Sequence, residues 1–222
     1  MGSITRSFAN NIGSSGILTA SAVTNTTVED VTSFDNAASS ATLVLLSTQT
    51  ASASATISFT TGLDSTYDEY IFKFINCHPA TDNVSFQFNL STDGGSSYAV
   101  TKTSSAFQNY HNEADSEAGQ AYHSSIDLAQ STSPQILLGS GGVGNGNDES
   151  ASGYLHLFAP SSTTYVKHYI ARNQFYQYDN YSRDDFVAGY ANTTSAVNAV
   201  QFTMSSGNID DGIIKMYGVA KS

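Results

Sequence analysis

The chain has 222 residues, of which 12% are charged, 40% hydrophobic and 11% aromatic, and its formal net charge is -11. A single cysteine excludes an intrachain disulfide framework and a multi-cysteine zinc site. The acidic balance repels phosphate backbones and anionic lipids, and the eight Lys and Arg residues are scattered along the sequence, which argues against nucleic acid as a partner. No apolar run approaches the roughly 20 residues that cross a bilayer, so membrane insertion is not expected. These features predict a soluble, β-rich protein.

Residues 1–40 are rich in Ser, Thr, Asn, Ala and Gly. Their few large apolar residues keep neither the period of a strand nor that of a helix, so this segment cannot bury enough apolar surface by itself to offset the entropy of ordering it. We interpret residues 1–40 as an extended N-terminal arm that docks on another subunit. A disordered tail is the alternative, and composition does not separate the two.

From residue 42 onward the pattern changes to the period of two that is typical of strands with one buried face. Residues 52–59 and 84–91 alternate apolar and polar side chains, and residues 70–77 carry large apolar groups on both faces. Asp93-Gly94 follows the second of these segments and predicts a tight hairpin turn, because glycine adopts positive φ readily.

Further extended segments are expected at residues 135–138, 153–158, 165–178, 186–190, 197–204 and 213–219. They are separated by a glycine-rich loop at residues 139–148 and by turn-rich stretches at 179–185 and 205–212. Roughly nine to eleven strands without helical crossovers indicate an all-β, antiparallel β-sandwich over residues 41–222. A jelly roll is the preferred form, since it disposes of strand edges by folding two sheets together.

The sequence offers no catalytic centre that we can specify. His111 and His123, near Glu113 and Asp115, provide ligand types for a metal, but their spacing matches no known metal motif. No GxSxG nucleophile elbow is present. The acidic pairs Asp184-Asp185 and Asp210-Asp211 leave open a structural divalent cation or a glycosidase-like carboxylate pair; acidic turns that face water are the simpler interpretation. We therefore expect a protein that is not an enzyme and has no cofactor.

An aromatic and polar cluster surrounds the turn predicted at residues 179–185. Its candidate contact residues, for a host surface or another partner, are Tyr176, Tyr178, Asn180, Tyr181 and Arg183. Tyr, Asn and Arg side chains together make an adaptable contact surface for a protein or a sugar ring. Packing of alternate members into the core is the competing interpretation.

Four stretches of the chain carry a family resemblance: residues 1–11 (MGSITRSFANN), 55–70 (ATISFTTGLDSTYDEY), 152–158 (SGYLHLF) and 206–218 (SGNIDDGIIKMYG). Together they resemble small virion proteins of marine tailed bacteriophages. The resemblance implies a virion structural protein, assembled in the host bacterial cytoplasm, whose arm binds other virion proteins. No functional residues of that family are carried over.

Within this resemblance, a tail fibre or receptor-binding component that contacts a host surface glycan or protein is the first expectation. A capsid decoration or head-fibre protein is the alternative. A glycan depolymerase is less favoured, because no internal repeat is visible. The two apolar faces of residues 70–77 further predict a homo-oligomer, with a trimer as the expected form, since one sandwich core covers only one of those faces.

Overall fold

The structure, a computed structural model, describes residues 43–139 and 141–220. The chain divides into two units, Met1–Ala41 and Thr42–Ser222, and the described residues all belong to the second. The predicted N-terminal arm lies outside the described residues. Within the described ranges no helix is long and apolar enough to span a bilayer.

The described part of the chain contains twelve strands. They are β1 (Leu43–Ser54), β2 (Ile57–Phe59), β3 (Glu69–Pro79), β4 (Phe86–Ser91), β5 (Lys102–Asn112), β6 (Ala118–Tyr122), β7 (Gln135–Ile136), β8 (Ala151–Phe158), β9 (Lys167–Gln177), β10 (Tyr181–Ala191), β11 (Ala199–Met204) and β12 (Ile209–Val219).

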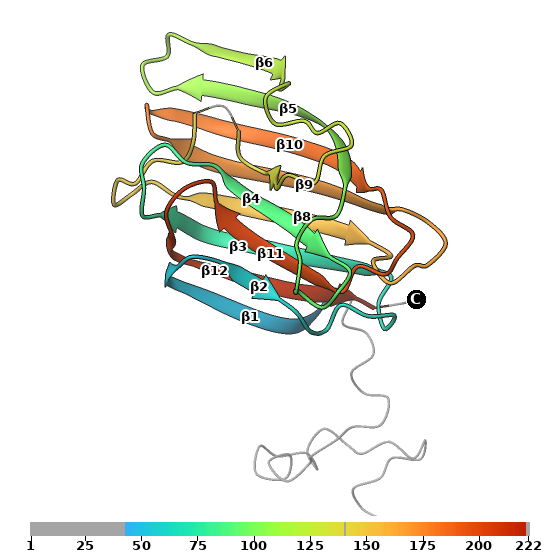
Figure 1. Cartoon of the computed structure of the whole chain (residues 1–222). Coiled ribbons are helices and arrows are strands. Elements are labelled where there is room, and N and C mark those ends of the chain that lie inside the picture. The colour runs from blue at the N-terminus through green and yellow to red at the C-terminus, as the bar shows by residue number, and fades with distance from the viewer. Residues whose placement is uncertain (1–42, 140, 221–222) are drawn as a thin grey trace, which may run out of the picture. The chain divides into compact units, whose positions relative to one another are not determined.

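The strands form two sheets (Figure 1). The larger sheet has eight strands in the order β1-β12-β3-β8-β9-β10-β5-β6, and the smaller has four in the order β2-β11-β4-β7. Neighbouring strands are antiparallel in both sheets. The predicted all-β, antiparallel β-sandwich is thus confirmed. The β5–β6 and β9–β10 hairpins widen the larger sheet at one side.

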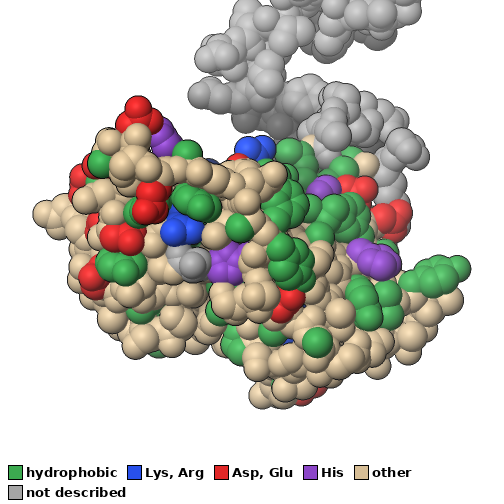
Figure 2. Space-filling model, turned by 90° about the horizontal axis from the view of Figure 1, so that it is seen from above, with side chains coloured by type: hydrophobic (Ala, Val, Ile, Leu, Met, Phe, Trp, Pro, Cys, Tyr) green, Lys and Arg blue, Asp and Glu red, His purple; other side chains and the backbone are tan. Residues whose placement is uncertain are grey.

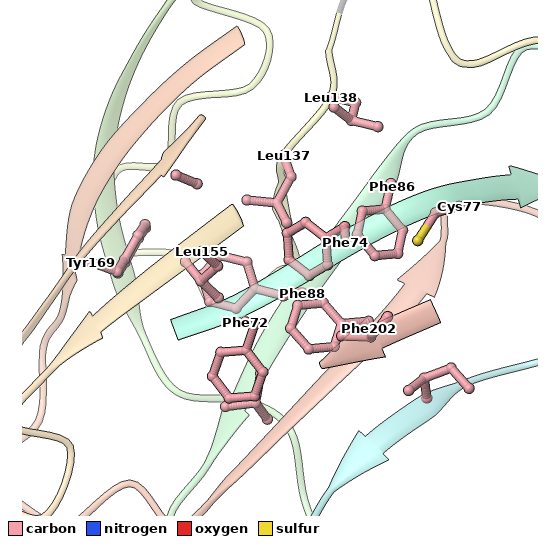
Figure 3. Close-up of a cluster of buried hydrophobic side chains, with 14 of the residues drawn as sticks. Phe72, Phe74, Cys77, Phe86, Phe88, Leu137, Leu138, Leu155, Tyr169 and Phe202 are labelled. Carbon is pink, nitrogen blue, oxygen red and sulfur yellow. The ribbon is translucent and has the colours of Figure 1, made fainter. Parts of the chain in front are cut away.

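An aromatic cluster fills the space between the two sheets (Figure 3). Phe202 of β11 lies at its centre, with its ring centroid 5.1 Å from that of Phe74 and 5.4 Å from that of Phe72 in the facing sheet. The alternation in β4 places Phe86, Phe88 and Leu90 in this core, as its sequence predicts. Edge-to-face and offset contacts of this kind add to the stabilisation from buried area alone.

The chain between β6 and β8 covers the inner face of the widened part of the larger sheet. Leu137 and Leu138 are fully buried there, and the Tyr169 hydroxyl of β9 donates a hydrogen bond to Gln135 at 2.9 Å. Across this segment the Gly139 amide donates to the carboxylate of Asp185 in β10 at 2.6 Å. The β9–β10 hairpin is therefore packed on its inner face by this segment.

Three local predictions were wrong. Residues 52–59 are not one strand, because the chain leaves β1 near Ala53, at a φ of 48°, and crosses to the other sheet as β2. The Asp93-Gly94 turn does not close a hairpin, since β4 and β5 belong to different sheets. The stretch 179–185 is only in part a turn, because β10 begins at Tyr181. In the first two cases the period of two locates extended backbone but does not say which sheet it joins. In the third, the polar residues of 181–185 hide the start of a strand.

Candidate functional site

The turns at one end of the sandwich concentrate negative charge. The turns after β3, β5 and β9 and those before β8 and β12 meet there, because the strands of the larger sheet are antiparallel. We call this the acidic end; its carboxylates are Asp82, Glu113, Asp115, Glu117, Asp148, Glu149, Asp179, Asp210 and Asp211. Figure 2 shows Asp and Glu side chains gathered at the left of that view. Anionic ligands are repelled from such a surface.

A groove of about 440 Å³ opens at the acidic end, on the side of the larger sheet. It is lined by His111, Asn112, Glu113, Asp148, Ser150, Gln174, Tyr176, Tyr181 and Ser182. Strands β5, β9 and β10, the turn after β5 and the turn before β8 supply these side chains. Most of the lining groups accept hydrogen bonds, donate them, or do both.

Tyr176 and the turn around it form one wall of the groove. The Tyr176 hydroxyl donates to Glu113 Oε1 at 2.9 Å and lies 3.1 Å from Asn180 Oδ1. Hydrogen bonding to Glu113 raises the pKa of Tyr176, so the hydroxyl keeps its proton. Asn180 sits at a φ of 67°, which asparagine tolerates, and its carbonyl accepts a hydrogen bond from the Glu113 amide at 3.0 Å. The β9–β10 and β5–β6 turns are thereby joined.

Tyr181 makes contacts within the protein beside the groove. Its hydroxyl donates to Glu117, and its ring lies 5.2 Å from the Arg183 guanidinium carbon, which is equally close to the Tyr110 ring. Arg183 is also hydrogen-bonded to Gln108 and Gln177. Two of its guanidinium nitrogens thus donate within the protein, and Arg183 does not line the groove.

The glycine-rich loop packs against the sandwich. Val143 is fully buried and forms backbone bridges with Val84 and Gln177. A Cβ atom on Gly142 would stand 2.3 Å from the backbone of Val84, so only glycine permits this approach. The described residues of this loop are thus held against the sandwich by backbone hydrogen bonds.

A second groove, of about 540 Å³, adjoins the first and shares Asp148 and Ser150 with it. It also contains His78, whose Nε2 lies 3.1 Å from the Gly146 carbonyl oxygen, and Asp210 and Asp211. Among residues 43–139 and 141–220, no three His, Cys, Asp or Glu side chains are placed to hold a metal ion.

The histidine pair proposed as metal ligands does not converge. His111 pairs with Ala118 across β5 and β6, whereas His123 donates its backbone amide to Ala106, five residues further along β5. The two histidines are therefore about 17 Å apart along the strand. Asp184 and Asp185 likewise cannot share a cation, because Asp184 pairs with Arg172 on the outer face and Asp185 is buried on the inner one.

Comparison of the chain with protein-family models, curated proteins and solved structures finds no match.

Of the five contact residues predicted from sequence, the structure brings Tyr176, Asn180 and Tyr181 to or beside the groove. Tyr178 projects from the turn with 40% of its surface exposed, and Arg183 is directed elsewhere. Glu113 and Asp148 also line the groove, although they lie 63 and 28 positions from Tyr176 and are not among the five predicted contact residues. Nothing in the sequence pattern shows that their turns meet at this end.

Proposed function

We propose that the chain is a bacteriophage virion structural protein that contributes to host attachment as a tail-fibre or receptor-binding component. The observation that carries the proposal is the groove at the acidic end, where tyrosine, amide and carboxylate side chains from the ends of strands and from the adjoining turns meet. Recognition commonly uses such positions, because turns vary without disturbing a core. The resemblance of four sequence stretches to phage virion proteins supports the same assignment.

The strand order supports a jelly roll as the form of the sandwich. With the two inserted hairpins set aside, the larger sheet reads β1-β12-β3-β8 and the smaller β2-β11-β4-β7. The first and last strands are neighbours in one sheet, and the strands next to them in sequence are neighbours in the other. This is the arrangement expected when two Greek keys are rolled together.

The chemistry of the groove favours a neutral polyhydroxylated ligand such as a host surface saccharide. Glu113, Asp148 and Gln174 offer planar acceptor groups for sugar hydroxyls, and the rings of Tyr176 and Tyr181 offer apolar surface for a sugar face. An anionic glycan would meet the carboxylates of the acidic end and bind less well.

The double substitution Tyr176→Ala and Tyr178→Ala tests this assignment. We expect binding of the purified protein to host cells to fall at least about tenfold, since aromatic anchors carry much of the energy of such contacts. Tyr181 is left intact because its ring holds Arg183. The thermal unfolding temperature should change little, because Tyr178 is exposed and the Tyr176 hydroxyl bonds at the surface.

The matched control is Tyr165→Ala, which removes a tyrosine that is 73% exposed and lies outside both grooves. It should bind host cells as the wild type does. Undiminished binding of the double variant would refute the assignment of the groove and favour a role in capsid decoration.

A second test concerns the N-terminal arm. Deleting residues 2–40 should leave a folded sandwich, because the buried core residues of the described chain all lie between Ala51 and Met216. The shortened protein should no longer be incorporated into particles, which Western blotting of purified virions measures. Incorporation at the normal level would contradict the assigned role of the arm.

A further inference from the structure

The outer face of the larger sheet, the face turned away from the smaller sheet, carries most of the exposed apolar side chains. Nine large hydrophobic residues are exposed among the residues that the structure describes. All of them except Tyr165 and Tyr178 lie on this outer face, as the strand registers show. In Figure 1 the smaller sheet lies in front of the larger one and covers its other face.

Large side chains form a continuous row across the middle of the outer face. Strand register places Lys215, Lys73, Tyr154, Arg172, Phe186 and Phe107 in successive strands. The rings of Phe107 and Phe186 stack at 4.5 Å, and the Arg172 guanidinium lies 4.7 Å above the Phe186 ring. Ile170, beside this row, is 48% exposed. Aromatic residues and arginine are the types enriched in protein interfaces.

The row also gathers basic residues that lie far apart in the sequence. In sequence, Lys73, Arg172 and Lys215 look scattered, yet the register brings them to one face together with the carboxylates of Glu69 and Asp184. Two of the other described basic residues, Lys102 and Lys167, are fully buried. Two copies of this acidic chain would therefore repel each other at the acidic end, and the outer face, which carries both signs of charge, is where that repulsion is weakest.

The outer face is large enough to hold two copies together. Eight strands about 4.8 Å apart, most of them about 11 residues long, give a face about 35 Å on each side and roughly 1,200 Å² in area. A stable interface buries about 800 Å² on each partner.

We propose that the outer face of the eight-stranded sheet packs against the same face of a second copy of this chain. A contact between identical faces has two-fold symmetry, so it yields a dimer. This proposal differs from the trimer expected from the sequence. The groove lies at the acidic end of the same face, because strand register places its Gln174, Tyr176 and Ser182 on the side that carries Arg172 and Phe186. Dimerisation is measured by sedimentation and host binding by attachment to cells, so either proposal can fail without the other.

Sedimentation of the full chain with substitutions at the centre of the face tests the proposal. The wild type should sediment as a dimer at micromolar concentration, and Ile170→Lys or Phe107→Lys should weaken the dimer about 100-fold by burying an unpaired charge. Both side chains are already partly exposed, so the monomers should still fold, as circular dichroism measures, and their melting temperature should fall only by the stabilisation that the dimer provides. Tyr165→Lys, which places the same charge off the face, should remain a dimer.

Labelling of an Ile170→Cys variant with a maleimide identifies what covers the face. The native Cys77 is fully buried, and burial raises the pKa of its thiol to about 12, so it should not react. The proposal predicts slow labelling at high protein concentration and fast labelling after dilution. Four results would overturn the proposal. Two concern a monomer: rapid labelling at every concentration, or protection at every dilution because its own chain covers the face. The others are a trimer and a dimer that Ile170→Lys does not weaken.

Discussion

Replacing Phe202 by alanine is expected to lower the free energy of unfolding by about 4 kcal/mol, the largest effect that we predict for a single substitution. The Phe202 ring is fully buried and contacts Phe72 and Phe74 of the larger sheet as well as Phe86 and Phe88 of its own sheet. Its removal leaves a cavity at the place where the two sheets meet, and the surrounding rings can fill it only in part.

Chemical denaturation monitored by circular dichroism measures this loss. The control is Tyr165→Ala, which removes an exposed ring and should change the free energy of unfolding by less than about 0.5 kcal/mol. A loss below about 1 kcal/mol at Phe202 would mean that the two sheets do not pack through this cluster.

Asp185→Asn is expected to stabilise the protein by about 2 kcal/mol at pH 7.5 and to have little effect near pH 4. Burial raises the pKa of Asp185 to about 6, and the amide of Gly139 and the charge of Arg183 oppose this rise only in part. One oxygen of its carboxylate is buried without a hydrogen-bond partner. Ionising this group inside the protein is therefore costly.

The sign of the pH dependence follows from the raised pKa. The folded protein binds the Asp185 proton more tightly than the unfolded chain does, so the stability contributed by this site is complete below about pH 4 and is lost as pH rises through about 6. Asparagine keeps an amide oxygen that accepts the hydrogen bond of Gly139 and has no charge to bury. The stability of the variant therefore should not fall as pH rises through about 6. The difference in unfolding free energy between variant and wild type, measured from pH 4 to 8, isolates Asp185 from the other carboxylates. A difference that does not grow with pH would contradict this explanation.

Much of the fold could be predicted because the alternation of apolar and polar residues along a strand indicates which of its faces is buried. Phe86, Phe88 and Leu90 read as one buried face in the sequence and form one in the structure. Residues 70–77 carry apolar groups on both faces, and β3 indeed buries Phe72 and Phe74 while leaving Ile75 partly exposed on the outer face. Strands such as β3 and β4 could therefore be located from local pattern alone, whereas β6 and most of β5 were not predicted.

The candidate site and the outer face depend on contacts between distant segments, which local pattern does not contain. The groove needs the turn at Glu113 and the turn at Asp148 to meet beside Tyr176. The row of Lys215, Lys73 and Arg172 exists only once β12, β3, β8 and β9 are placed in register. A shift of one residue in any of these pairings would turn the side chains of that strand to the other face.

A cryo-EM map of the virion at residue resolution tests the central proposal, attachment to a host, most directly. We expect density for the sandwich of residues 43–220 at the tail, with the acidic end and its groove around Tyr176 directed away from the particle. Density for the sandwich on the capsid surface, or at the tail with the acidic end buried against another virion protein, would contradict it.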